Sequence, residues 1–166
     1  WSISISETDP IFCQSINVRC VRGSLDDVLD RYHLAAQSVA ASVIVRLTGD
    51  CPFCDPGVID ALVDKFTAGG FDYVSNTLNP TYPDGLDTEV FSRQALETAH
   101  LNAALPSERE HVTPYIKKSN TFRKFSFEND VDLNALRWTV DEPDDFELIR
   151  QIFEELYPQI PDFRMS

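Results

Sequence analysis

The apolar positions of this chain follow two spacings that alternate along its length. Short apolar or alternating runs predict β-strands, and apolar residues every three or four positions predict amphipathic helices. The predicted strands lie near residues 2–6, 17–21, 43–48, 71–75, 88–91, 121–128 and 136–140. The predicted helices begin near residues 10, 24, 56, 92, 107 and 143. This alternation predicts a three-layer α/β/α, Rossmann-like domain whose sheet is mostly parallel.

Several of the expected helix starts carry N-cap signals. Ser24 with Asp27, and the segment 107–110, have the spacing of a capping box. Asp55 stands directly before a proline, and Ser92 precedes another helical pattern, so both are expected N-caps. Because no linker or repeat interrupts the pattern, residues 1–166 are expected to form a single domain.

Two of the predicted strands end in a single acid. The run that starts at Val43 stops at Asp50, and the run that starts at Leu136 stops at Asp141. Taken alone, Asp50 is equally a turn residue, and Asp141 is equally part of a helix start. Taken together they suggest a shared Mg²⁺, because ligands bind at strand carboxyl ends and Mg²⁺ uses one or two carboxylates.

Charge excludes several classes of partner. The formal net charge of −13 argues against nucleic acid and against anionic membrane surfaces. No run approaches the roughly 20 apolar residues that span a bilayer, and no signal peptide is visible, so a cytoplasmic location is expected. A phosphate ligand would need cations, for which Arg46, Arg137 and the pair Lys117-Lys118 are candidates.

Four cysteines are too few and too unevenly placed for a disulfide framework. Cys51 and Cys54 form a C-x-x-C, which is either a redox pair, half of a zinc site, or two small apolar residues on a loop. The last interpretation is favoured, since the sequence offers no second pair of ligands to complete a zinc site.

Two further segments are rich in polar side chains. The loop 82–89 contains Tyr82, Asp84, Asp87 and Glu89, and is either a solvated turn or a loop that binds the hydroxyl groups of a substrate.

The segment 107–115 presents Glu108, Arg109, Glu110 and His111. It is either an exposed helix face with an internal ion pair, or a helix that directs Glu110 and His111 into a site. The other two histidines, His33 and His100, fall within predicted helices and are expected to be surface or packed residues.

Several motifs stand in the order found in one known family. They are Arg46-Leu-Thr-Gly-Asp-Cys-Pro52, Tyr73-Val-Ser-Asn76, Tyr82-Pro-Asp-Gly-Leu-Asp87, Glu89-Val-Phe91, Ser107-Glu-Arg-Glu-His-Val-Thr-Pro-Tyr115, Arg137-Trp-Thr-Val-Asp141 and Pro143-Asp-Asp-Phe-Glu147. The chain resembles the spore-coat-polysaccharide type of cytidylyltransferase, which is similar to the CMP-3-deoxy-manno-octulosonate and CMP-sialic acid synthetases. The resemblance runs from about Ser2 to Tyr157.

The resemblance implies a nucleotide-diphospho-sugar transferase fold and a CTP-dependent reaction. A sugar, expected to be a sugar acid, would receive CMP and release pyrophosphate for surface polysaccharide synthesis. Asp50 and Asp141 would hold Mg²⁺, and Arg46 would act beside them. The remaining implied site residues are substrate contacts: Tyr82, Asp84, Asp87, Glu89, Glu110, His111 and Arg137. A homodimer is expected because relatives commonly dimerise.

The family also opens with a strand and an Arg- and Gly-containing phosphate loop that have no counterpart in this sequence. We therefore expect an N-terminally shortened domain that lacks roughly 30–40 residues, the scale of a βαβ unit. Two other functions stay open at this point. One is a glycosyltransferase of related fold that uses a nucleotide-sugar donor, and the other is a truncated domain without catalysis.

Overall fold

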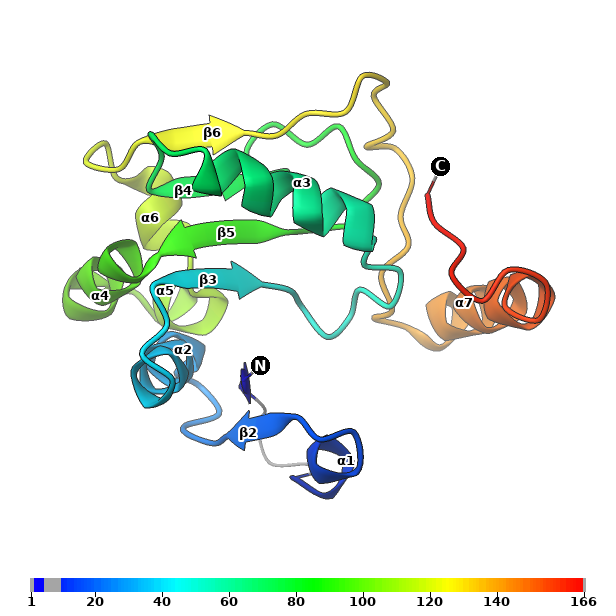
Figure 1. Cartoon of the computed structure of the whole chain (residues 1–166), viewed down its shortest axis with the longest axis horizontal. Helices are drawn as coiled ribbons and strands as arrows, with labels where there is room; N and C mark the ends of the chain where they lie inside the picture. The colour runs from blue at the N-terminus through cyan, green and yellow to red at the C-terminus, as the bar shows by residue number, and fades with distance from the viewer. Residues whose placement is uncertain (1, 5–9, 166) are drawn as a thin grey trace. The chain divides into compact units, whose positions relative to one another are not determined.

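The structure is a computed structural model that describes residues 2–4 and 10–165 (Figure 1). Its Cα positions fall into two compact units, one formed by residues 1–44, 71–73 and 91–124, and the other by residues 45–70, 74–90 and 125–166. No described helix has the length and apolar character that crossing a membrane requires.

The helices of the first unit enclose its own apolar core. Its elements are β1 (Ser2–Ser4), α1 (Pro10–Ser15), β2 (Arg19–Val21), α2 (Val28–Ser38), α4 (Arg93–Asn102), α5 (Pro106–His111) and α6 (Pro114–Lys118). Strands β1 and β2 pair in parallel, with Ile3 opposite Cys20. Leu29 of α2, Leu96 of α4 and Ile116 of α6 are completely buried. Burying each of these side chains contributes roughly 1.5–3 kcal/mol to folding.

A second sheet contains four strands in the order β3-β5-β4-β6. They are β3 (Val43–Arg46), β4 (Tyr73–Ser75), β5 (Glu89–Ser92) and β6 (Lys124–Ser126). Strand β5 runs against β3 and β6 in Figure 1, so the sheet is mixed. A polar loop without a helix joins β4 to β5, and such a loop suits an antiparallel pair because parallel neighbours need a crossover. The α/β class is confirmed, and β6 is an edge strand, as its alternating sequence predicts.

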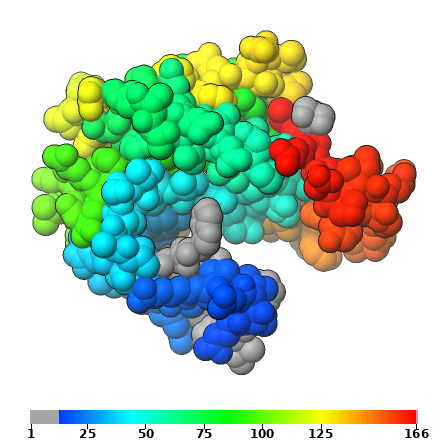
Figure 2. Space-filling view, viewed as in Figure 1, coloured from blue at the N-terminus to red at the C-terminus, as the bar shows by residue number. Residues whose placement is uncertain are grey.

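The remaining elements belong to the second unit. They are α3 (Pro56–Thr67) and α7 (Pro143–Leu156). Helix α3 begins as predicted, because one carboxylate oxygen of Asp55 accepts the backbone N–H groups of Gly57 and Val58 at 2.7 and 3.3 Å. Met165 donates its backbone N–H to the other Asp55 oxygen at 3.0 Å, so the C-terminal residues, red in Figure 2, lie against the start of α3.

Two predicted helix starts are wrong by a few residues. Helix α2 begins after Asp27, whose carboxylate accepts the N–H of Asp30, and Ser24 lies in the preceding loop. Helix α5 begins at Pro106 because proline loses no helical hydrogen bond at that position. The Glu108 carboxylate, rather than Ser107, satisfies the N–H groups that precede this helix.

The predicted strand 136–140 is also wrong. This segment is extended, but its one ladder contact in the described structure is an isolated parallel bridge between Asp84 and Arg137. Its sequence has the β-branched, alternating character of a strand. Its backbone partners, however, are loops rather than a neighbouring strand, so no regular ladder forms.

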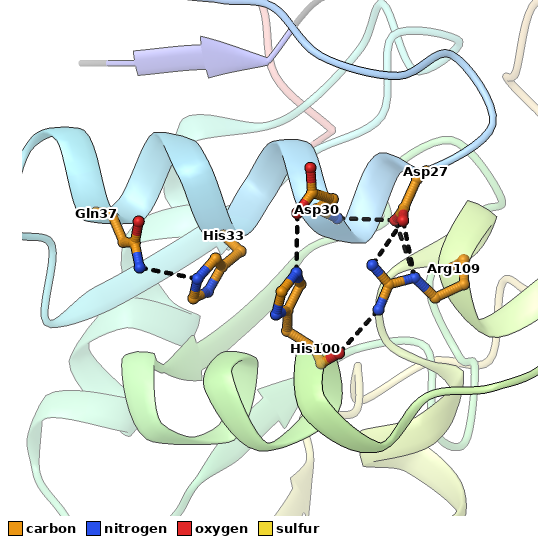
Figure 3. A network of polar contacts seen from close by, with 6 residues as sticks. All are labelled: Asp27, Asp30, His33, Gln37, His100 and Arg109. Carbon is orange, nitrogen blue, oxygen red and sulfur yellow. Dashed lines mark hydrogen bonds and ion pairs between the residues drawn. The ribbon is translucent and has the colours of Figure 1, made fainter.

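A polar network joins three helices of the first unit (Figure 3). Arg109 of α5 donates to both carboxylate oxygens of Asp27 at 2.6–3.0 Å, and His100 of α4 lies 2.9 Å from Asp30 of α2. The rings of His33 and His100 stack with centroids 4.0 Å apart. Both histidines are therefore packed against each other, as expected for residues within helices. The network fixes α2 against α4 and α5 with groups that are only partly exposed, where ion pairs lose less to solvent screening.

Candidate functional site

The loop that follows β3 carries the first acid of the candidate site. Cys51 donates its N–H to the Thr48 carbonyl at 3.3 Å, and Cys54 donates to the Cys51 carbonyl at 3.3 Å. These two turns lead from the strand to the Asp55 cap of α3 and leave Asp50 partly exposed between them. Asp50 therefore stands on a loop at the carboxyl end of a strand, as the sequence predicts.

The extended segment 136–141 connects this loop with the acid-rich loop. Asp84 donates its N–H to the Leu136 carbonyl at 3.0 Å, and Trp138 donates to the Asp84 carbonyl at 2.7 Å. Further along, Val140 donates its N–H to the Asp50 carbonyl at 2.8 Å. Since Asp141 follows Val140 directly, the structure brings the backbones of the two predicted metal ligands side by side.

A glycine permits the close approach of these segments. Gly85 has a φ of +110°, and a Cβ at this position would lie 2.8 Å from the backbone carbon of Trp138. An L-residue would suffer both the left-handed conformation and this collision. The Asp84-Gly85 turn is therefore a requirement of the backbone, as well as a source of one carboxylate.

Asp141 is held by its own neighbours. Arg137 donates to the Asp141 carboxylate and, at 2.8 Å, to Asp145, while the Thr139 hydroxyl donates to Asp141 at 3.1 Å. Asp145 also accepts the N–H groups of Asp141 and Glu142 at 3.1 and 2.9 Å. Hydrogen bonds from Arg137, and then from these two N–H groups, lower the pKa of Asp145 to about 2. Sequence reasoning missed Asp145, although its place three residues after Glu142 is that of a capping-box acid.

The donor set suits a hard cation that brings its own ligands. The described residues contain no group of three or more His, Cys, Asp or Glu side chains arranged to hold a metal ion. Two carboxylates on neighbouring loops match Mg²⁺, which keeps several waters and binds substrate phosphates. Asp50 and Asp141 thus fit a magnesium ion shared with a nucleotide better than a site built from protein ligands alone.

Arg46 and Glu89 bind each other. The guanidinium of Arg46 donates to the Glu89 carboxylate at 2.6 Å, and their side chains are 17% and 2% exposed. These residues lie on the neighbouring strands β3 and β5. The pair therefore has a structural role in the sheet, whatever else either side chain binds.

The acid-rich loop is ordered by a buried asparagine that the sequence analysis did not single out. The Asn76 side chain donates to the Leu86 carbonyl at 2.8 Å and accepts the N–H of Thr88 at 2.9 Å. These bonds close the loop at its base and leave Asp84 exposed and Asp87 partly exposed. The sequence feature that could have indicated this role is the position of the asparagine, directly after the buried strand β4.

Tyr82 lies on the wall of a small cavity. Its ring stacks on Phe127 with centroids 6.3 Å apart and an interplanar angle of 21°. Burial, followed by the charges of Asp130 and Asp55, raises the pKa of Tyr82. The cavity has a volume of about 210 Å³, and Arg164 also contributes to its lining.

The two cysteines of the C-x-x-C are poorly ionised thiols. Burial raises the pKa of Cys51 to about 12 despite a 3.1 Å contact with the Thr48 hydroxyl, and the Asp50 charge adds to the shift. Burial and the charges of Asp87 and Asp50 also raise the pKa of Cys54. Metal binding and redox chemistry both need thiolates, so these shifts fit the interpretation of small apolar loop residues.

Glu110 and His111 belong to the first unit, whereas the other predicted site residues belong to the second. Both are exposed at the end of α5, just before Val112, which has a φ of +71° and a ψ of −57°. Thr113 donates its N–H to the His111 carbonyl at 2.8 Å, which makes this a rare and strained γ-turn. The alternative of an exposed helix face with an internal ion pair is wrong in detail, because Arg109 pairs with Asp27 and Glu108 is buried.

Comparison with known proteins shows the family of this chain. A family model described as cytidylyltransferase matches residues 3–159. An uncharacterized protein of Methanocaldococcus jannaschii is 42% identical over 143 residues, which cover 84% of this chain and 58% of that protein. The spore coat polysaccharide biosynthesis protein SpsF of Bacillus subtilis is 34% identical over 159 residues, 92% of this chain and 65% of that protein. The chain thus spans about three fifths of the length of these curated relatives.

Solved structures give the same fold. A cytidylyltransferase from Leptospira borgpetersenii superposes with a TM-score of 0.85 at 30% identity, over 97% of this chain and 71% of that one. A CMP:2-keto-3-deoxy-manno-octonic acid synthetase complexed with CTP has a TM-score of 0.63 at 15% identity, over 93% and 81% of the two chains. The second likeness bears on the fold alone, and it agrees with the α/β, Rossmann-like class that the sequence predicts.

Proposed function

This chain belongs to the cytidylyltransferase family, and from that premise we propose that its protein transfers CMP from CTP to a sugar and releases pyrophosphate. A sugar hydroxyl attacks the α-phosphorus of CTP, the bond to the bridging oxygen of the β-phosphate breaks, and the hydroxyl proton passes to solvent. The proposed acceptor is a sugar acid, and the proposed role is surface polysaccharide synthesis. The observation that supports the proposal is the 2.8 Å backbone hydrogen bond from Val140 to Asp50, which brings the backbone of Asp141 close to that of Asp50.

The proposed magnesium ion would be held by the carboxylates of Asp50 and Asp141. When bound, it would neutralise charge on the phosphates and orient them, which is the main requirement of phosphoryl and nucleotidyl transfer. Arg137 holds the Asp141 carboxylate in one orientation through the bond between them.

The acid-rich loop supplies the proposed substrate contacts of the second unit. Asp84 and Asp87 present carboxylates that accept hydrogen bonds from hydroxyl groups, and Tyr82 offers an aromatic wall. Arg46 and Glu89 support the sheet beneath this loop through their ion pair. Glu110 and His111 of the first unit stay proposed substrate contacts, which the same acceptor panel tests.

The test is pyrophosphate release from CTP with Mg²⁺ across a panel of sugar acids and matched neutral sugars. Asp50→Asn and Asp141→Asn are each expected to lower turnover by at least 100-fold, and Asp60→Asn, an exposed acid on α3, serves as the matched control. Mn²⁺ binding followed by electron paramagnetic resonance gives a readout independent of activity. Wild-type turnover in either variant would remove that residue from the metal role, and turnover with a UDP-sugar donor instead of CTP would favour a glycosyltransferase.

A further inference from the structure

Arg31 is a buried cation without an anion. It lies in the first turns of α2 and is 6% exposed, and its Nε atom has no hydrogen-bond partner. Within the part of the chain that the structure describes, its guanidinium makes no ion pair or side-chain hydrogen bond at all. Removing a charge from water costs several kcal/mol unless a partner compensates. A residue in this position therefore calls for an anionic partner that binds it.

The stem of Arg31 passes directly beneath the loop between β2 and α2. A Cβ placed on Gly23 would lie 2.8 Å from Cγ and 3.6 Å from Cδ of Arg31. A Cβ at that separation would force the arginine stem to shift, so glycine allows the arginine to run back under the loop. Figure 1 shows this loop as the blue connection from β2 to α2.

The same loop offers unused donors. In the described structure the backbone N–H groups of Gly23, Ser24 and Leu25 have no hydrogen-bond acceptor. They precede a helix of 11 residues, whose N-terminus carries a partial positive charge. A strand, a glycine-containing loop and a helix start are the arrangement in which backbone N–H groups cradle phosphates.

Asp27 and Asp30, at the start of the same helix, form their ion pairs with residues other than Arg31. Asp27 is neutralised by Arg109, which donates to both of its oxygens, and Asp30 pairs with His100. Within the residues that the structure describes, the Arg31 guanidinium is therefore left without an ion-pair partner. A ligand with negative charge and several acceptor oxygens matches these groups.

We propose that Arg31 and the backbone of residues 23–25 bind a phosphate group. The group comes either from a nucleotide or from free phosphate or pyrophosphate, and the chemistry of recognition is the same in each case. This proposal is independent of the assigned reaction, because it rests on the first unit and on none of the residues proposed to hold Mg²⁺.

The test compares wild-type protein with Arg31→Met by isothermal titration calorimetry and thermal unfolding. The titrants are inorganic phosphate, pyrophosphate, CTP and cytidine, without divalent metal. Gly23→Ala is a second variant, since its Cβ would displace the arginine stem. Arg93→Met is the matched control, because that partly exposed guanidinium already has a partner in Glu97.

We expect at least a tenfold loss of affinity for phosphate-containing titrants in Arg31→Met and Gly23→Ala, and none in Arg93→Met. Without an anion, Arg31→Met is expected to unfold at an equal or higher temperature, because it removes an uncompensated buried charge. Phosphate binding that survives in Arg31→Met overturns the proposal. So does cytidine binding that disappears with Arg31, or destabilisation of anion-free Arg31→Met by more than a few degrees.

Discussion

Replacing Glu89 with glutamine is the sharpest test of how the sheet supports the candidate site. The substitution keeps the shape of the side chain and removes its charge, so the Arg46 guanidinium loses the negative charge that lies 2.6 Å away. Breaking one side of a buried pair costs roughly 3–5 kcal/mol. Because the Arg46 side chain is 17% exposed, solvent offsets part of this cost. We therefore expect the free energy of unfolding to fall by an amount near the lower limit, about 3 kcal/mol.

The assay is urea unfolding at pH 7 followed by circular dichroism, with thermal unfolding beside it. For a domain of this size, a loss of about 3 kcal/mol corresponds to a fall of roughly 6–12 °C in the melting temperature. Glu97→Gln is the control, because it weakens the partly exposed i,i+4 pair between Arg93 and Glu97 on α4, which is worth only about 0.3–0.5 kcal/mol.

A double replacement completes the experiment. Arg46→Met with Glu89→Leu removes both charges and fills the space with apolar atoms, a change that is often neutral for buried pairs. We expect it to recover more than half of the stability lost in Glu89→Gln. A single variant within about 1 kcal/mol of wild type would refute the reasoning, as would a double variant no more stable than Glu89→Gln.

Three further results are expected. Burial, followed by the charge of His100, lowers the pKa of His33. Because the unfolded chain then binds a proton at a higher pH than the folded protein, the free energy of unfolding should fall as the pH drops below about 6.5. A His33→Gln variant whose urea midpoint depends on pH as that of the wild type does would contradict this. Gly85→Ala should lower the free energy of unfolding by well over 1 kcal/mol, because its Cβ meets the Trp138 backbone. Gly69→Ala, with a φ of +92° and open space around it, should lower it by less, and equal losses in urea unfolding would count against the collision. Because the pKa of Cys51 is about 12, its thiol should react slowly with iodoacetamide at pH 8 in the folded protein. Mass spectrometry that shows the folded protein modified at Cys51 as fast as the protein unfolded in urea would disprove this.

The elements that the sequence predicts correctly are those with a local cause. Asp55 before Pro56 and Ser92 before Arg93 both form the expected N-caps, since the capping side chain and the helix start are neighbours in sequence. The start of α2 was missed by a few residues because Ser24 and Asp27 both satisfy the capping pattern. Asp27 is used because Arg109, 82 residues away, orients its carboxylate.

The acids of the candidate site could be predicted from the sequence, but the contacts that hold their surroundings in place could not. Asp50 and Asp141 stand out because each ends an apolar run, and the structure brings their backbones together. The pairing of Arg46 with Glu89 depends on which strands are neighbours, and no local pattern encodes that order. The strand expected at 136–140 failed for the same reason, since its hydrogen bonds go to loops distant in sequence.

The strip 136–140 has a consequence for how this protein can diversify. It links the two acid-bearing loops through main-chain atoms, in bonds of 2.7–3.0 Å that involve no side chain. Exchanges of side chains around Tyr82 and Asp87 would therefore leave the spacing of those loops unchanged. Preference for one proposed acceptor over another can therefore change at the loop surface while the backbone geometry that would serve the proposed reaction is retained.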